Sequence, residues 1–326
     1  MAKRGRPPHP DVLTPREWEV CPLFLPHPPA PTYAESVTEP EDRFYEASRL
    51  RLHYVVWGDE SKPALLLVHG GRDHARSWDF VAQRLLDRFA VYAPDLRGHG
   101  DSDWAQGGAY QLADYVADLA CLVDVIGRPV SIVGHSLGGR VVLNYAAAFA
   151  DRVRALVCIE GFGRLGPDAP ASARLRGYVR NIREMETRRV HAYATLEAAA
   201  ARMQEANHRL SPAMVRHLTE HAVRRREDGT YVWKFDNYVR LNGPTAWTAE
   251  EATALWRGIR ARVLLVGGAE SWLSRLPVRP ASKQEIEGLA ASIPGAQSVV
   301  VEDAGHWVHH DQFERFVALL REFLSD

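Results

Sequence analysis

Short, continuously apolar runs alternate with helix-patterned segments over most of this chain. The β-rich runs lie at 50–57, 64–69, 89–93, 130–134, 154–159, 262–267 and 297–302. The helical patterns lie at 75–88, 110–126, 136–150, 284–292 and 311–324. Continuous rather than alternating apolar residues are typical of strands covered on both faces. Strands that alternate with helices predict an α/β fold with a parallel sheet and right-handed crossovers.

Two segments depart from this alternation. Residues 164–257 show helical periodicity with almost no strand signal, and they stand between two predicted strands. We therefore expect a mostly helical cap at 164–257, inserted into a core formed by 43–163 and 258–326. Residues 1–42 are rich in proline and charged residues, and such a segment buries too little apolar surface to offset its ordering entropy. We expect it to be a flexible extension.

The composition of the chain argues against nucleic acid and membranes as binding partners. Apolar residues make up 46% of the chain and charged residues 25%, with a net charge of −1, so no overall field favours nucleic acid or an anionic membrane. No apolar run approaches the roughly 18 residues of a membrane span, and no apolar stretch follows the basic N-terminus as in a secretory signal. Three cysteines at unrelated spacings suit a reducing compartment, so we expect a cytoplasmic location.

The motif Gly134-His135-Ser136-Leu137-Gly138 stands between a predicted strand and a predicted helix. G-x-S-x-G in that context is typical of a nucleophile elbow, whose glycines allow a tight turn that holds the serine at its tip. We therefore predict that Ser136 is the nucleophile. The backbone N–H of Leu137, at the start of the helix, is positioned to stabilise an oxyanion.

A second motif, His69-Gly70-Gly71, directly follows the strand at 64–69. The loop after a neighbouring strand is where a second oxyanion donor is expected, and by position that donor is the N–H of Gly71. Arg72 and His74 follow in the same loop and are candidate substrate contacts.

A serine hydroxyl needs a base, and the late loop Asp303-Ala304-Gly305-His306-Trp307 supplies one after the last predicted strand. Its position at the same sheet edge as the serine selects His306 among the 14 histidines. Trp307, Trp272 and His135 flank the candidate acid, base and nucleophile, and we predict that they contact substrate.

Together, HGG at 69–71, PDLRGHGDS at 94–102, GHSLGG at 134–139 and the His306 loop resemble the α/β-hydrolase superfamily over residues 44–160 and 258–325. The stretch from Tyr193 to Asn237 is similar to that of the serine hydrolase-like proteins. The resemblance implies an eight-stranded, mostly parallel, doubly wound sheet with a helical cap. It also implies hydrolysis of ester-like substrates without a cofactor, and we expect no metal.

The acidic member of a catalytic triad is ambiguous. In most of the superfamily an aspartate follows the strand after the cap, where this chain has Ser271. Glu270 is one residue earlier and has a longer side chain. Glu160 ends the strand at 154–159, and the superfamily's haloalkane dehalogenases place a catalytic glutamate at the corresponding strand end. We favour Glu160 over Glu270, because a carboxylate at the serine's sheet edge can hold the imidazole.

These residues predict hydrolysis of an ester-type bond in a small, partly apolar molecule through an acyl-enzyme. Serine at the elbow argues against epoxide hydrolase and dehalogenase chemistry, which need a carboxylate nucleophile. Carbon–carbon bond hydrolysis and cofactor-free haloperoxidation use the same triad and stay open, as does a non-catalytic ligand receptor. We also leave open a homodimer. The arginines from Arg174 to Arg189, interleaved with glutamates, predict an ion-paired helix surface rather than a site for an anionic substrate.

Overall fold

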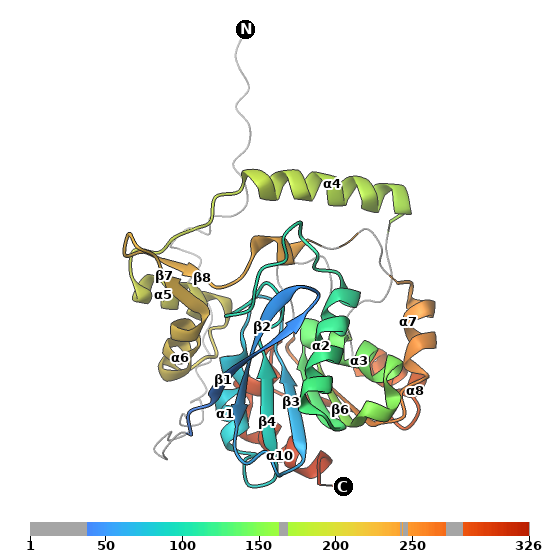
Figure 1. Cartoon of the computed structure of the whole chain (residues 1–326). Helices are drawn as coiled ribbons and strands as arrows, with labels where there is room; N and C mark the ends of the chain where they lie inside the picture. Colours follow the sequence, from blue (N-terminus) through green and yellow to red (C-terminus); the bar gives the residue numbers. More distant parts are fainter. Residues whose placement is uncertain (1–37, 163–168, 242, 244–246, 272–282, 326) are drawn as a thin grey trace, which may run out of the picture. The chain divides into compact units, whose positions relative to one another are not determined.

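The computed structural model describes residues 38–162, 169–241, 243, 247–271 and 283–325 (Figure 1). Most of the predicted N-terminal extension lies outside these residues, and so does Trp272. Within the described part of the chain, no helix combines the length and the apolar character needed to cross a membrane.

An eight-stranded sheet forms the centre of the fold, in the order β1-β2-β4-β3-β5-β6-β9-β10. Its strands are β1 (Glu41–Ala47), β2 (Leu50–Trp57), β3 (Ala64–Val68), β4 (Ala90–Pro94), β5 (Val130–His135), β6 (Val153–Ile159), β9 (Arg262–Gly268) and β10 (Gln297–Val301). β2 runs antiparallel to β1 and β4, and every other pair in the sheet is parallel. The predicted eight-stranded, mostly parallel sheet is confirmed.

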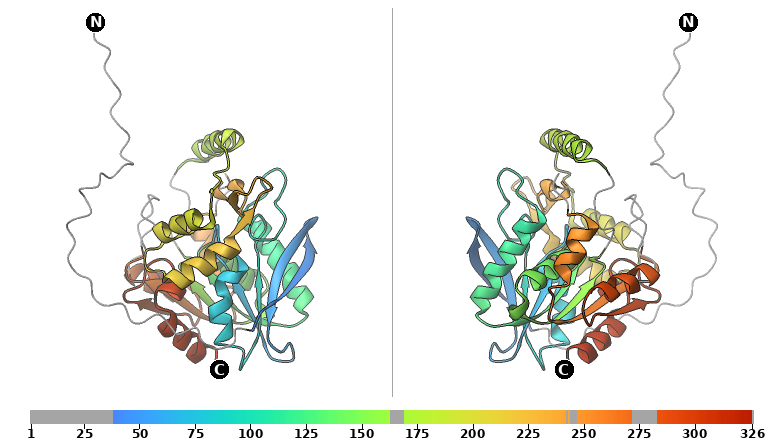
Figure 2. Two further views of the ribbon diagram at one scale, coloured as in Figure 1. Left: turned by 90° about the vertical axis from the view of Figure 1, so that its left-hand side faces the viewer. Right: turned by 90° about the vertical axis from the view of Figure 1, so that its right-hand side faces the viewer.

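Helices cover both faces of this sheet, as a doubly wound fold requires (Figures 1 and 2). One face packs against α2 (Leu112–Ile126), α3 (Leu137–Ala148), α7 (Ala249–Trp256) and α8 (Lys283–Ser292). The other face packs against the 3-10 helix η2 (Ala75–Trp78), α1 (Asp79–Gln83), α9 (Val308–Asp311) and α10 (Phe313–Phe323). The side chains of β3 alternate between the two cores, with Leu66 in the first and Leu65 and Leu67 in the second.

The segment between β6 and β9 is mostly helical in its described part. It contains α4 (Ala171–Thr187), α5 (Leu196–Ala206), α6 (Pro212–Ala222), the hairpin β7 (Val223–Arg225) and β8 (Tyr231–Trp233), η4 (Asn237–Arg240) and α7. Local capping explains two of its helix starts: the hydroxyls of Thr195 and Ser211 accept backbone N–H groups at the first turns of α5 and α6. α4 buries no residue and stands farther from the sheet than α5 and α6 (Figure 2).

Candidate active site

Two neighbouring parallel strands, β5 and β6, carry candidate residues directly beyond their carboxyl ends. The backbone N–H of Ser136 donates to the carbonyl of Ile159 over 2.8 Å, and that of Glu160 donates to the carbonyl of Val266 over 3.0 Å. These bonds continue the ladders of β5 with β6 and of β6 with β9. Ser136 and Glu160 therefore lie side by side at one edge of the sheet.

The turn between β5 and α3 holds Ser136 in a strained backbone conformation, with φ 52° and ψ −111°. A Cβ atom on Gly134 would lie 2.5 Å from the carbonyl oxygen of Gly138, and one on Gly138 would lie 2.4 Å from that of Val68. Side chains at these two positions would therefore open the turn. The geometry matches the elbow that the sequence motif predicts.

The carboxylate of Glu160 faces His306. Oε2 of Glu160 lies 3.3 Å from Nδ1 of His306, whose side chain is 7% exposed. Two further donors fix the carboxylate: the N–H of Gly268 bonds Oε1 over 2.9 Å, and the hydroxyl of Ser271 bonds Oε2 over 2.5 Å. Ser271, which the resemblance places where the superfamily usually has its acid, therefore supports the carboxylate that follows β6.

Glu270 points elsewhere. Its carboxylate forms an ion pair with Arg209, and its side chain is 53% exposed. Its backbone N–H donates to the carbonyl of Ala304 over 2.9 Å, which ties the end of β9 to the His306 loop. Of the two acidic residues that the sequence left open, Glu160 is the one that contacts the imidazole.

The loop after β3 brings Gly71 next to the start of α3. A Cβ atom on Gly71 would lie 3.8 Å from the side chain of Leu137. As the first residue of α3, Leu137 has an N–H group without a partner inside the helix. The two residues predicted to donate to an oxyanion, Gly71 and Leu137, are therefore neighbours in space.

His69 holds this loop in place, a role that the sequence reasoning missed although the residue opens the HGG motif. Its Nδ1 donates to the carbonyl of Gly70 over 2.7 Å, and its Nε2 accepts the N–H of Leu96 over 2.9 Å. The ring is fully buried, and burial lowers its pKa to about 4, so it stays neutral near pH 7. A neutral ring is required, because Nε2 accepts a hydrogen bond through its lone pair.

His135 positions the candidate base. Its buried ring lies 4.8 Å from that of His306, and its Nε2 donates to the carbonyl of His306 over 2.9 Å. Burial holds the pKa of His135 well below its usual range, so the ring adds no charge beside His306. These contacts lie within the protein, and the expected contact between His135 and substrate stays a prediction.

The remaining predicted substrate contacts differ in exposure. Arg72 is exposed, while His74 is buried and its Nε2 donates to the carbonyl of Leu218 in α6 over 3.0 Å. Trp307 is half-buried, and its ring stands at 84° to that of His306 with centroids 5.3 Å apart. Of the two tryptophans predicted to contact substrate, Trp307 lies within the described residues, and its ring contacts that of His306.

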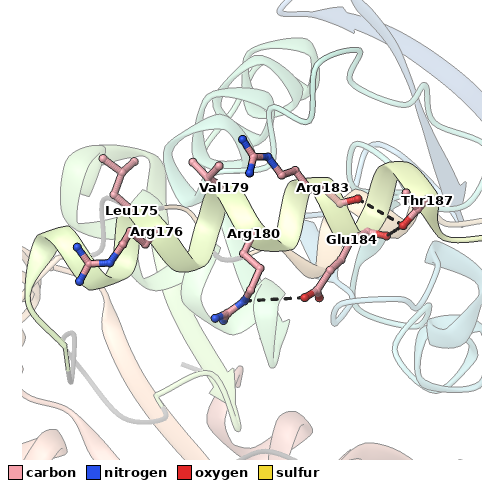
Figure 3. Close-up of a pocket in the computed structure, with 7 residues that line it drawn as sticks. All are labelled: Leu175, Arg176, Val179, Arg180, Arg183, Glu184 and Thr187. Atoms are coloured by element: carbon pink, nitrogen blue, oxygen red, sulfur yellow. Dashed lines mark hydrogen bonds and ion pairs between the residues drawn. The ribbon is translucent and has the colours of Figure 1, made fainter.

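A hollow of about 670 Å³ lies along α4 (Figure 3). All its lining residues belong to α4 and are exposed: Leu175, Arg176, Val179, Arg180, Arg183, Glu184 and Thr187. Arg180 approaches Glu184 to 3.8 Å, an exposed ion pair of the kind predicted for this helix. The hollow is therefore a surface groove with no residue of the Ser136 site.

Known proteins resemble this chain in sequence. The model of the Alpha/beta hydrolase family matches residues 65–319. An esterase of Mycobacterium tuberculosis is 30% identical over 272 residues, which cover 82% of this chain and 85% of the esterase. A serine hydrolase-like protein of Danio rerio is 25% identical over 277 residues, covering 83% and 84% of the two chains, so the predicted resemblance to these proteins is confirmed.

Solved structures agree on the fold. The thioesterase domain from the curacin biosynthetic pathway superposes with a TM-score of 0.76 at 22% identity, covering 86% of this chain and 99% of that domain. The family match spans most of the sheet, including β5, the elbow and the loop that carries His306. The chain therefore belongs to the alpha/beta hydrolase family.

Proposed function

We propose that this hydrolase cleaves ester bonds through a covalent acyl-enzyme, with Ser136 as nucleophile, His306 as general base and Glu160 as the acid of the triad. The observation that carries the proposal is the placement of the strained Ser136 at the sheet edge where Glu160 lies 3.3 Å from Nδ1 of His306. Such a geometry orients the imidazole so that its other nitrogen can accept a proton.

In the first half-reaction, Oγ of Ser136 attacks the ester carbonyl carbon while Nε2 of His306 takes the hydroxyl proton. The N–H of Nδ1 donates to Glu160, whose negative charge stabilises the imidazolium that forms. The carbonyl oxygen becomes an oxyanion and accepts the N–H groups of Leu137 and Gly71. The carbon–oxygen bond of the ester then breaks, and His306 gives its proton to the departing alkoxide, which leaves as an alcohol.

The second half-reaction repeats this chemistry with water. His306 removes a proton from water, the hydroxide attacks the acyl carbon, and the oxyanion again occupies the same two N–H groups. The tetrahedral intermediate collapses, the proton returns to Oγ of Ser136, and the carboxylic acid leaves. His306 carries every proton transfer in these steps, and the two amides only donate hydrogen bonds, so the sequence needs no cofactor.

A small, partly apolar ester fits the surroundings of the site. The half-buried ring of Trp307 lies beside His306, and the half-buried side chain of Leu137 follows Ser136. Both offer apolar contact to a substrate. The similar esterase of M. tuberculosis supports the same substrate class.

Turnover of p-nitrophenyl esters of increasing acyl length tests the proposal. We expect the wild type to hydrolyse some members and Ser136→Ala to lose on the order of 10⁶ in kcat. Ser131→Ala, on the same strand β5, is the matched control and should retain its rate. Hydrolysis by Ser136→Ala above about a tenth of the wild-type rate would remove Ser136 from the proposed role.

A further inference from the structure

We propose that Asp79, His217 and His221 form a binding site for a divalent transition-metal ion such as Zn²⁺, which would join the cap helix α6 to the core helix α1. This site is separate from Ser136, Glu160 and His306, and the inference goes beyond the proposed hydrolysis. Its residues come from segments more than a hundred positions apart in the sequence.

Two of the three ligands share one face of a helix. His217 and His221 are spaced i, i+4 on α6, and their ring centroids lie 4.8 Å apart. Two histidines at this spacing are a common means of holding zinc, because both imidazoles point to the same side of the helix. The buried Asp79 at the start of α1 faces them from the core.

The distances suit a small tetrahedral ion. Oδ2 of Asp79 lies 3.3 Å from Nε2 of His217, and one ligand atom from each of the three residues falls within 4.8 Å of the others. Zinc bonds of about 2.0–2.2 Å at tetrahedral angles separate neighbouring ligand atoms by about 3.3–3.5 Å. The Asp79–His217 pair already has this separation, and ion binding would require His221 to bring a ring nitrogen to the same separation from both.

An ion would have to share these groups with their current partners or replace those partners. Arg76 bonds both oxygens of the Asp79 carboxylate: its Nε lies 2.9 Å from Oδ1 and 2.8 Å from Oδ2, and its Nη2 lies 2.7 Å from Oδ2. A carboxylate has about four lone-pair sites, so an ion would share Asp79 with this guanidinium. Nε2 of His217 also lies 3.1 Å from the carbonyl of Arg76, so its proton now serves that oxygen or Asp79. A metal would replace this proton, while the nearby guanidinium would weaken its affinity.

A second group of possible ligands in the described part of the chain fits less well. It consists of His53, Asp95 and Asp101. Both ring nitrogens of His53 are used by carboxylates, with Asp95 at 2.7 Å and Asp42 at 3.0 Å. With one imidazole already bonded on both sides, this group favours structural hydrogen bonding over metal binding.

An ion at the first site would strengthen an existing junction between cap and core. On the same side of α6, His74 donates to the carbonyl of Leu218, and the ring of Phe80 lies 4.7 Å from that of His217. The bound ion would add bonds from α6 to Asp79, so unfolding or lifting of α6 would require releasing it. We therefore expect metal to stabilise the folded chain.

Zinc titration of the full chain in competition with a chromophoric chelator tests this site. We expect one equivalent to bind the wild type, and His217→Ala and His221→Ala to bind at least about tenfold more weakly, since each loses one of three protein ligands. His208→Ala, at an exposed cap histidine, is the matched control and should bind like the wild type. Equal affinity in all four proteins would overturn the proposal.

Thermal unfolding supplies a second readout that does not depend on hydrolysis. Zinc should raise the midpoint of the wild type and of His208→Ala, and should raise that of His221→Ala by a smaller amount at the same zinc concentration. The metal-free midpoints of the variants report whether each is folded. A zinc-dependent rise as large in His221→Ala and in His217→Ala as in the wild type would place the ion elsewhere and overturn the proposal.

Discussion

Replacing Glu160 with glutamine removes one charge beside His306 while keeping the size of the side chain. The Oε1 atom can still accept the N–H of Gly268, but an NH₂ group replaces the oxygen that faces Nδ1. That NH₂ group favours the imidazole tautomer with its proton on Nε2, which cannot accept the proton of Ser136. The variant should therefore fold and bind substrate but turn over slowly.

The structure gives the size of this effect. At the 3.3 Å that separates Oε2 from Nδ1, the attraction between a carboxylate and an imidazolium is about 5 kcal/mol for an effective dielectric constant of about 20. Because each 1.36 kcal/mol is a factor of ten, its loss lowers kcat by about 10³–10⁴. The charge pair exists when the imidazolium forms, so the loss should appear in kcat more than in KM.

Steady-state kinetics with a p-nitrophenyl ester measure this loss, and Glu270→Gln is the matched control. The Glu270 side chain is largely exposed and pairs with Arg209, so its rate should change by less than about tenfold. Thermal unfolding of both variants checks that they are folded. The reasoning is refuted if Glu270→Gln loses the activity while Glu160→Gln keeps it.

Three further results should follow. Adding Ser271→Asp to Glu160→Gln should raise kcat at least about tenfold above that of Glu160→Gln alone. The Ser271 hydroxyl lies 2.5 Å from the Glu160 carboxylate, so a carboxylate at position 271 can reach His306. A double variant no faster than Glu160→Gln would contradict this. The free energy of unfolding, measured with urea, should fall as the pH is lowered from 7 to 5. Burial lowers the pKa of His69 to about 4 and that of His99 to about 3, so both rings stay neutral in the folded chain at pH 5. In the unfolded chain the same rings bind protons below about pH 6.5, so each lowers the stability of the folded state by up to about 2 kcal/mol at pH 5. A constant or higher stability at pH 5 would argue against neutral buried rings. Phe316→Ala should cost about 3–5 kcal/mol in urea unfolding, since this α10 ring is fully buried in the second core, and a loss below about 1 kcal/mol would mean that the helix repacks.

The sequence predicted the central sheet well because its strands are buried on both faces and therefore continuously apolar. It missed β1 at the sheet edge, whose sequence EDRFYEA begins with three charged residues and buries only Tyr45 and Ala47. The β7–β8 hairpin also escaped prediction, because three residues per strand give no periodicity. The helix expected at 75–88 ends at Gln83, after which Arg84 and Leu85 continue with i−3 bonds.

The site was predictable where a motif encodes local geometry. The elbow at Ser136 is such a case, since the two glycines and the strained turn are contiguous in the chain. For the partner of His306, the sequence favoured Glu160 but left Glu270 open, because β6 and β9 are hydrogen-bonded neighbours separated in sequence by residues 160–261. Only their register brings Ser271 and Glu160 together and turns Glu270 toward Arg209. The cluster of Asp79 with His217 and His221 depends in the same way on how α6 packs on α1.

The account depends most on Ser136 being an activated nucleophile. Labelling with a fluorophosphonate probe, followed by mass spectrometry of the peptides, tests this directly, because the probe reacts with a serine whose proton a base can remove. We predict one modified residue, Ser136, with labelling abolished in Ser136→Ala and slowed strongly in Glu160→Gln. Undiminished labelling of Ser136→Ala, or a folded wild type that takes up no probe, would contradict the account.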